Sequence, residues 1–596
     1  MAKKFRRRAQ FLLHICILLG ANSPSFARAK RYIVKIGASG YAGQSTRALM
    51  AVRSSNLSSV AKEVDLNVPG SRSVFKAKKF GMLIVESSAN DGLLESALAQ
   101  HPYVKYFEED YLFQVNSANV TGASGNSCDS SFSRTGTRNC ITNPSPSSFS
   151  LSPWLRDVLG MEAGSPAADI EYVGNTPTIV AVIDTGAMVA HPFLKHAIAR
   201  NSQEFSGQTN VDNDGNGVID DIYGASFTVN SAGALEVSGD PSDNGTDHGT
   251  HVAGTIKSIR DQAIASLGTG TSAPQRVQIL PIRFINESQV GSTSGAIAAL
   301  EYAATRGAKV VNCSWGAKGT EAFTESLYDA FKEAYEVHDM LITIAAGNAE
   351  RFGANNNDLI PYFPSSMNVP SIISVASVTA EYRSGSETGG SLASNPSISD
   401  FSNYGANSVH IAAPGGFKDQ NGNSDGVSSA NARLMDSNGS IYTRKKGTSM
   451  AAPVVAGIAG VVRALNPGLT SYEVKKLLME TAETRNVGAN VASNVSSKGM
   501  VSAAKAFEEA QNIDTRGEKP PVEGEPYYTY QSSASTTAPS KSSGGGGCGA
   551  LHPMSTGGSS NGNGPLGGNS LLLFSTMYLI GFFIRSLQRR KAKGRV

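Results

Sequence analysis

A serine at the start of an apolar helix constrains this chain more than any other feature. Ser449 follows a Gly-Thr pair and precedes a run of small and apolar residues that continues to Leu465. The apolar residues of this run recur at helical spacing, which predicts a buried helix. A serine at such an N-terminus lies among free backbone N–H groups and the positive end of the helix dipole, a setting that suits an anionic intermediate. Taken alone, Ser449 is better explained as an N-cap residue, a position that serine prefers.

Two other stretches change that interpretation. An apolar β run that begins at Thr178 ends in Asp184, and His248 stands at the start of a second helix of small residues. An Asp followed by Thr-Gly can also merely close a turn. Nucleophilic catalysis by a serine, however, needs a base that takes its proton and an acid that orients the base. Asp184, His248 and Ser449 supply all three groups, in the chain order acid, base, nucleophile.

The residues around these three side chains resemble a known family. Asp184-Thr-Gly, His248-Gly-Thr-His and Gly447-Thr-Ser-Met-Ala-Ala-Pro are similar to motifs of the subtilisin-like serine proteases, the subtilases, whose triad has the same chain order. The resemblance covers about residues 154–510 and implies a serine endopeptidase that hydrolyses peptide bonds in protein or peptide substrates. The competing hypothesis is a non-catalytic surface adhesin or binding protein on the same scaffold.

β runs and helical segments alternate through this region, which predicts an α/β fold with a mostly parallel sheet and helices on both of its faces. Ligands of such sheets bind at the carboxyl ends of the strands, and Asp184 and Asn348 both fall just past a predicted strand. The predicted strands are 179–183, 278–284, 309–313, 341–345, 372–376 and 409–412. The predicted helices are 251–260, 294–305, 320–338, 450–465 and 471–480.

The resemblance assigns further residues to the site. Asn348 follows a buried strand, and by resemblance it supplies a side-chain N–H to an oxyanion hole that the backbone N–H of Ser449 completes. The stretch Val311-Asn-Cys-Ser-Trp-Gly resembles the subtilase strand that pairs with the substrate backbone. A turn asparagine and an ordinary core strand are the alternatives. The expected substrate-binding residues are Ser314, Trp315 and Gly316.

An acidic loop precedes the predicted histidine. Its oxygen-bearing side chains occupy alternate positions and Gly217 is sixth, as at the start of a calcium loop. Tyr223 stands at the twelfth position, where an EF-hand has Glu, so a complete EF-hand is disfavoured. Subtilases carry similar calcium loops here, and a solvated acidic turn is the alternative. The predicted Ca²⁺ ligands are Asp212, Asp214, Asn216 and Asp220. His248 and His251 lack a His-Glu-x-x-His pattern, which disfavours zinc.

The formal net charge of +3 comes from the two ends of the chain. Residues 1–8 hold five basic and no acidic residues, and residues 585–596 hold six basic and no acidic residues. Subtracting these eleven from the 52 basic residues leaves 41 against 49 acidic residues, which is a net charge of −8 for the rest. The basic balance therefore gives no reason to expect a nucleic-acid partner.

The N-terminal part is organised like an exported precursor. Residues 1–27 combine a basic start, a short apolar run and small residues at the end, as in a secretory signal peptide rather than a membrane anchor. Residues 28–115 form a small α+β unit, which by resemblance is an inhibitory ferredoxin-like propeptide; an independent binding domain is the alternative. Residues 116–153 form a polar connector with the expected maturation site. Its Cys128 and Cys140 are expected to form a disulfide.

The C-terminal part carries a candidate membrane segment. Residues 511–568 are a low-complexity linker rich in Ser, Thr and Gly. Residues 569–584 are mostly apolar and residues 585–596 form a basic tail, which predicts a transmembrane or sorting segment. A single-pass anchor and a bacterial sorting signal processed near Cys548 are both open. We therefore expect a secreted or cell-surface protein of the bacterial cell envelope, inhibited by its own propeptide until export.

Overall fold

The computed structural model describes residues 30–37, 46–87, 91–114, 153–161, 176–243, 245–268, 271–349, 353–382, 392–418, 424–432 and 441–528. Contacts divide the chain into two units, residues 1–531 and 532–596, and every described residue belongs to the first unit. Several predictions of the sequence analysis lie outside the described residues. They concern the signal peptide, the connector up to residue 152 with Cys128 and Cys140, Cys548, the apolar segment 569–584 and the basic tail.

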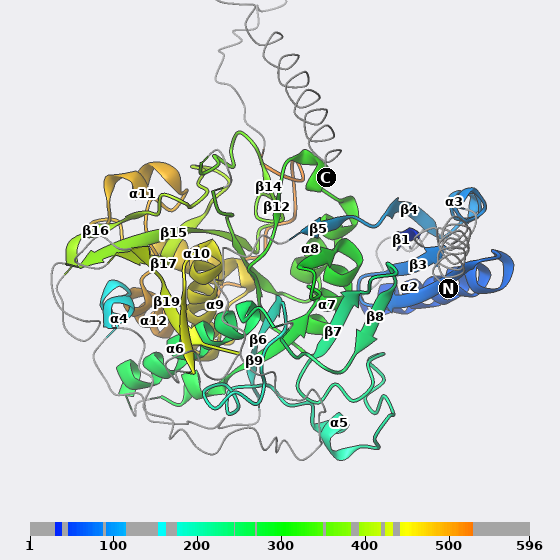
Figure 1. Cartoon of the computed structure of the whole chain (residues 1–596), viewed down its shortest axis with the longest axis horizontal. Helices are drawn as coiled ribbons and strands as arrows, with labels where there is room; N and C mark the ends of the chain where they lie inside the picture. The colour runs from blue at the N-terminus through cyan, green and yellow to red at the C-terminus, as the bar shows by residue number, and fades with distance from the viewer. Residues whose placement is uncertain are drawn as a thin grey trace, which may run out of the picture. The chain divides into compact units, whose positions relative to one another are not determined.

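Residues 30–109 fold into an α+β unit with the element order β-α-β-β-α-β (Figure 1, blue). Its elements are β1 (Lys30–Ile36), α2 (Thr46–Asn67), β2 (Ser71–Ala77), β3 (Met82–Ser87), α3 (Asp91–Gln100) and β4 (Val104–Glu109). The strands form an antiparallel sheet of order β2-β3-β1-β4, which is the ferredoxin-like arrangement. Leu57 of α2 and Leu94 of α3 belong to the core that covers this sheet. The sequence analysis expected this unit but did not identify α2 and β2.

A ten-stranded sheet forms the framework of the following region. Its strands are β6 (Thr178–Asp184), β7 (Ala225–Val229), β8 (Leu235–Ser238), β9 (Val277–Arg283), β11 (Val310–Cys313), β13 (Leu341–Ala345), β15 (Ile372–Tyr382), β16 (Leu392–Ile398), β17 (Ile411–Lys418) and β18 (Ser424–Asp425). Neighbours in the order β17-β15-β13-β11-β6-β9-β7 are parallel. β18, β16 and β8 pair antiparallel with this parallel part. The predicted mostly parallel α/β sheet is confirmed.

Helices cover both faces of this sheet. The long helices are α6 (His248–Leu267), α7 (Thr293–Thr305), α8 (Glu325–Glu336), α9 (Thr448–Leu465), α10 (Ser471–Glu480) and α12 (Ala503–Asn512). Along β6, Val180 and Val182 face the core that α6, α9, α10 and α12 share. The alternate residues Ile179, Ala181 and Ile183 face the second core, with α7 and α8. A strand buried on both faces explains why the sequence of β6 is continuously apolar.

The central helix of the first core is α9. Among the described helices, it is the one long and apolar enough to cross a membrane by length and composition. Its candidate span is 89% buried within the protein. We therefore assign its apolar character to the core of the fold.

Short elements complete the framework. They are α4 (Pro153–Val158), α5 (Ser202–Ser206), α11 (Ala489–Asn494), β5 (Leu112–Gln114), β10 (Val290–Ser292), β12 (Ala317–Lys318), β14 (Tyr362–Phe363), β19 (Val427–Ala430), β20 (Tyr442–Lys445) and 3-10 turns at Ala273–Arg276 and Thr320–Ala322. Several predicted boundaries were wrong. The predicted helix 251–260 extends over His248–Leu267, and the predicted strand 372–376 continues to Tyr382. The predicted helix 320–338 is a 3-10 turn followed by α8, because Phe323 and Thr324 have extended backbone angles. The predicted strand 409–412 begins later and continues to Lys418.

Candidate active site

Asp184 and His248 form a buried, hydrogen-bonded pair. Asp184 is the last residue of β6, and His248 is the first residue of α6. The Asp184 Oδ1 atom lies 2.7 Å from His248 Nδ1 and also accepts the backbone N–H of Thr185 at 2.7 Å. The Asp184 side chain is fully buried. Because an ionised carboxylate can only accept, Nδ1 carries the ring proton and Nε2 is left as the acceptor that a general base needs.

Two glycines allow β6 and α6 to meet this closely. Gly249 donates its N–H to Thr185 Oγ1 at 2.8 Å, and a Cβ atom on Gly249 would lie 2.1 Å from the Gly186 carbonyl oxygen. Gly186 has a φ of +90°, and its own Cβ would lie 2.4 Å from the Ser242 carbonyl oxygen. The sequences Asp-Thr-Gly and His-Gly-Thr are therefore two halves of one contact, which fixes the position of the imidazole.

Ser449 is the second residue of α9 and is partly exposed. Its Oγ atom donates to the Ser314 carbonyl oxygen at 3.2 Å, and Ser314 Oγ donates to the Ser449 carbonyl oxygen at 2.9 Å. No hydrogen bond joins Ser449 to His248 within the described residues. Rotation about the Cα–Cβ bond of Ser449 changes the partner of its hydroxyl, and catalytic hydrogen bonds are often long until substrate binds.

Asn348 lies just past β13, beside the residue that precedes Ser449. Its Oδ1 atom accepts the backbone N–H of Thr448 at 2.9 Å and the Thr448 hydroxyl at 3.1 Å. These two bonds occupy the carbonyl side of the amide and leave its NH₂ group as a donor. Gly347, with a φ of +102°, makes the turn between β13 and Asn348. The arrangement fits a side-chain donor to an oxyanion hole.

The predicted substrate-binding residues directly follow β11, and all three are buried. Trp315 is 3% exposed, and its Nε1 atom donates to the Ile183 carbonyl oxygen at 2.9 Å. Its ring stacks on that of Phe113 in β5, with ring centroids 5.3 Å apart and an interplanar angle of 6°. A Cβ atom on Gly316 would lie 2.4 Å from the Tyr362 ring, so glycine allows this close packing. The sequence analysis did not single out Phe113, which has no local motif.

His251, one turn into α6, has a structural role. Its Nε2 atom donates to the Val427 carbonyl oxygen at 2.9 Å, and its side chain is fully buried. Burial lowers the pKa of His251 to about 3, so its ring is neutral. His248 is therefore the histidine that the candidate active site uses.

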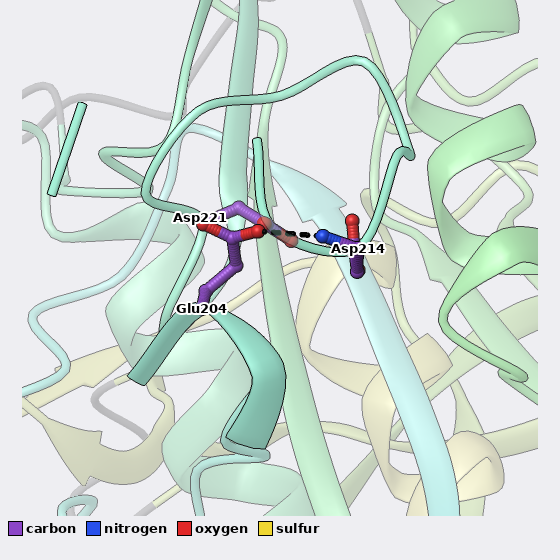
Figure 2. Close-up of side chains that lie close together, drawn as sticks. All are labelled: Glu204, Asp214 and Asp221. Atoms are coloured by element: carbon purple, nitrogen blue, oxygen red, sulfur yellow. Dashed lines mark hydrogen bonds between the residues drawn. The ribbon is translucent and has the colours of Figure 1, made fainter. Parts of the chain in front are cut away.

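The acidic loop gathers three carboxylates, those of Glu204, Asp214 and Asp221 (Figure 2). One oxygen of each lies within 4.8 Å of the others, and no other such group of metal-ligating side chains occurs among the described residues. Glu204 comes from α5 and accepts the backbone N–H of Asp214 at 3.1 Å. Asp221 is fully buried and accepts hydrogen bonds from the Tyr302 hydroxyl at 2.6 Å and from Asn201 at 3.2 Å. Burial raises the pKa of Asp221 to about 6.

This group overlaps only in part with the predicted calcium ligands. Asp214 belongs to it, and Asn216 donates to Asp214 at 2.9 Å. Asp212 and Asp220 accept backbone N–H groups instead, each at 2.8 Å, and so close the loop. The members of this group that the sequence analysis did not name as candidates are Glu204 and Asp221. Glu204 precedes the motif by eight residues, and the signal for Asp221 was only its place beside Asp220.

Comparison with known proteins adds an independent finding. Residues 175–503 match the Subtilase family. Subtilisin-like protease 1 of Plasmodium vivax is 28% identical over 314 residues, which are 50% of this chain and 43% of that protein. Fervidolysin of Fervidobacterium pennivorans is 29% identical over 334 residues, 55% of this chain and 40% of that protein. The crystal structure of fervidolysin superposes with a TM-score of 0.46 at 19% identity, over 80% of this chain and 61% of that one. The chain thus spans less than half the length of these two relatives.

Proposed function

The chain belongs to the subtilase family, and on that basis we propose that it is a serine endopeptidase that hydrolyses peptide bonds in proteins. The observation that carries the proposal is the buried 2.7 Å hydrogen bond between Asp184 and His248, with Ser449 at the N-terminus of α9. The names of the relatives, which are proteases, support the same activity.

In the proposed reaction, Ser449 Oγ attacks the carbonyl carbon of the substrate while His248 Nε2 takes the hydroxyl proton. His248 then gives this proton to the leaving amine, and a water molecule repeats the cycle to release the acyl group. Asp184 holds the imidazole in the required tautomer and stabilises its charged form. Asn348 Nδ2 and the Ser449 backbone N–H donate to the oxyanion. Because Thr448 already binds Asn348, this donor is oriented before the charge develops.

We also propose that residues 28–115 are an inhibitory propeptide whose end lies in the substrate groove. β5 pairs antiparallel with β10, and Phe113 is opposite Gly291. Phe113 is 6% exposed and packs against Trp315 and Phe284, with ring centroids 5.3 and 5.8 Å away. A Cβ atom on Gly291 would lie 2.7 Å from the Phe113 ring, so glycine makes room for it. A peptide that adds a strand at an edge binds in this way.

Polar contacts support the docking of the N-terminal unit. Asp110 accepts the backbone N–H and the hydroxyl of Ser294 at the start of α7, both at 2.8 Å, and Arg31 pairs with the same carboxylate. Glu108 accepts the backbone N–H of Ser326 at 3.1 Å, at the start of α8. Carboxylates are stabilised at helix N-termini by free N–H groups and the helix dipole. Covalent attachment adds a high effective concentration, so the unit should inhibit until the connector is cut.

The Ser449→Ala variant tests the activity and the self-processing together. We expect the wild-type chain to cut itself between about Gln114 and Ser150, in the polar connector. Ser449→Ala should stay uncut and should not hydrolyse casein, and N-terminal sequencing of the wild-type product identifies the bond. Equal cutting of both chains would assign processing to another protease. Casein hydrolysis by Ser449→Ala at the wild-type rate would refute the proposed nucleophile.

Labelling with a serine-directed fluorophosphonate separates the enzyme from the adhesin alternative. After removal of the N-terminal unit by an added protease, the wild-type protein should be labelled at Ser449. His248→Ala should abolish this labelling, because the hydroxyl loses its base. An unlabelled wild-type protein would favour a binding protein on the subtilase scaffold.

We further propose that Glu204, Asp214 and Asp221 hold a structural Ca²⁺ ion. The donors are carboxylate oxygens, which Ca²⁺ prefers. One carboxylate oxygen of each residue lies within 4.8 Å of the others, and Arg306 pairs with one of the three carboxylates, that of Asp221, at 3.1 Å. A bound Ca²⁺ would neutralise the repulsion between the carboxylates and link α5 to the loop.

Thermal unfolding with calcium and with chelator tests this site. At a calcium concentration of about 100 times Kd, the ion should stabilise the protein by about 2.7 kcal/mol. Asp214→Asn should lose most of this gain, whereas the matched control Asp212→Asn should keep it. The opposite ranking would favour the ligand set predicted from the loop motif, and no calcium effect on the wild type would exclude both.

Export, the Cys128–Cys140 disulfide and attachment to a membrane through residues 569–584 are also proposals that rest on the sequence. N-terminal sequencing of the secreted product bears directly on export and on the fate of the disulfide loop. A cut before Cys128 would leave the disulfide loop with the mature enzyme. A cut between the two cysteines would keep the propeptide covalently attached, so we favour the first.

A further inference from the structure

A cavity of about 880 Å³ lies apart from the candidate active site. None of the proposed catalytic, oxyanion-hole or substrate-binding residues lines it. Its walls come from the segments around Asp358, Asn407 and Tyr528 and from one side of α10. A cavity of this size lies within the range of about 300–1,000 Å³ that is typical of small-molecule sites.

Lys475 of α10 lines this cavity without a partner for its charge. The side chain is 8% exposed, and no described residue forms a hydrogen bond or an ion pair with its ammonium group. Burial lowers the pKa of Lys475 to about 7, since an unpaired buried charge is unfavourable. The adjacent Lys476 differs, because it pairs with Glu518 at 3.0 Å. Two acids, Asp358 and Glu480, also line the cavity, but neither forms an ion pair with Lys475 among the described residues. The Oδ1 atom of Asp358 accepts the N–H of Ser408 at 2.8 Å and the Ser408 hydroxyl at 2.7 Å.

Tyr528 presents a second donor to the same cavity. The backbone N–H of Ser374 donates to His410 Nδ1 at 2.9 Å, so the ring proton of His410 is on Nε2. Nε2 lies 3.2 Å from the Tyr528 hydroxyl oxygen and donates to it. Burial holds the pKa of His410 well below its usual value and raises that of Tyr528, so both groups are neutral. The Tyr528 hydroxyl proton is left as a donor, and no described residue accepts it.

We propose that this cavity is a second binding site, in which Lys475 and Tyr528 bind the carboxylate of a small organic acid or of a peptide C-terminus. A single unpaired cation matches a single negative charge, and a neutral hydroxyl donor can bind the second carboxylate oxygen. Tyr472 and Met479 supply apolar walls for the body of the ligand. Residues 529–596 contain no Asp or Glu, so this stretch offers no side-chain carboxylate.

Calorimetric titration of the full-length Ser449→Ala chain tests the proposal, because this variant should not digest a peptide. The probes are acetate, N-acetyl-trialanine with a free C-terminus, and the same peptide as its C-terminal amide. The free acid should bind about tenfold more tightly than the amide, as expected for one charge-assisted hydrogen-bonded pair. Acetate binding would assign the site to organic acids, and binding of the peptide alone would assign it to C-termini.

Second-site variants locate the binding. In the same background, Lys475→Met should weaken carboxylate binding about tenfold or more, and Tyr528→Phe should weaken it several-fold. Lys476→Met is the matched control and should leave the affinity unchanged. Equal affinity for the free acid and the amide would overturn the proposal, as would unchanged affinity for the free acid in Lys475→Met. Tyr528→Phe keeps the test valid if Lys475→Met does not fold, since it retains the buried lysine.

Discussion

At the scale of single residues, the hydrogen bonds that a side chain already makes determine which donors and acceptors it has left. The hydrogen bond that His248 Nδ1 donates to Asp184 leaves His248 Nε2 as an acceptor. The bonds from Thr448 to Oδ1 leave the Asn348 amide as a donor. The same reasoning identifies Tyr528, whose oxygen accepts from His410 and whose proton remains available. Roles in catalysis and binding therefore follow from hydrogen-bond direction as much as from residue type.

Replacing Asp184 by Asn tests whether catalysis depends on the hydrogen bond that orients His248 rather than on the size of the Asp184 side chain. The side chains have the same shape, but an amide can donate to Nδ1 and so move the ring proton to Nε2, which then cannot take the Ser449 proton. We expect kcat/KM to fall by about 10⁴ with little change in the thermal midpoint. Peptide hydrolysis is measured after an added protease has removed the N-terminal unit. A loss smaller than about tenfold would contradict the role given to Asp184.

At the scale of elements, β5 is a three-residue strand whose position depends on two aromatic contacts. Its partner β10 contributes Gly291, which has no side chain, so the Phe113 ring reaches Trp315 and Phe284. The backbone pairing is short, and Phe113 is the residue of β5 that belongs to the core. Removal of this ring should therefore release the strand.

The Phe113→Ala change tests this dependence in the full-length Ser449→Ala chain. Loss of a buried Phe costs about 3–5 kcal/mol in a core, so the β5 amides should exchange with solvent at least about tenfold faster. Tyr103→Ala is the control, because Tyr103 is in the same unit but is 40% exposed. Unchanged exchange in Phe113→Ala would mean that β5 is held mainly by its backbone hydrogen bonds.

At the scale of the whole molecule, buried acids lie between the N-terminal unit and α7 and α8. Figure 1 shows this unit beside these helices. Glu301 accepts the backbone N–H groups of Lys79 and Phe80 at 2.8 and 3.1 Å. Burial raises the pKa of Glu301 from its ordinary 4.5 to about 7. An acid whose pKa is raised by docking binds its proton more tightly in the docked state, so docking should weaken as the pH rises between these values.

A urea titration at several pH values measures this effect through the fluorescence of Trp315, which stacks on Phe113. The docked state of the Ser449→Ala chain should lose stability from pH 5 to 7, by up to about tenfold per pH unit for one proton. Glu301→Gln should reduce this slope. Trp154, the only other tryptophan, is replaced by Phe in both chains. An equal slope with and without Glu301 would exclude it as the titrating group.

Local patterns in the sequence were enough to predict the α/β framework of the molecule. The apolar run of β6, the small-residue helices α6 and α9 and the alternation between strands and helices predicted the α/β sheet, which the structure confirms. The triad and Asn348 were predicted from motifs that resemble those of the subtilases, and these residues stand at the ends of the predicted elements. Helix α2 was missed, since Ser54, Ser55, Asn56, Ser58 and Ser59 interrupt the apolar pattern in its middle.

Only the tertiary structure decided which distant residues meet. Glu204 joins Asp214 and Asp221 because α5 packs beside the loop, and no spacing rule in the sequence connects them. Phe113 covers Trp315 because β5 pairs with β10, across more than 170 residues of chain. Lys475 and Tyr528 line one cavity, although no motif in the surrounding sequence marks either residue. Elements follow from short-range periodicity, whereas these sites depend on long-range packing, which a local pattern does not encode.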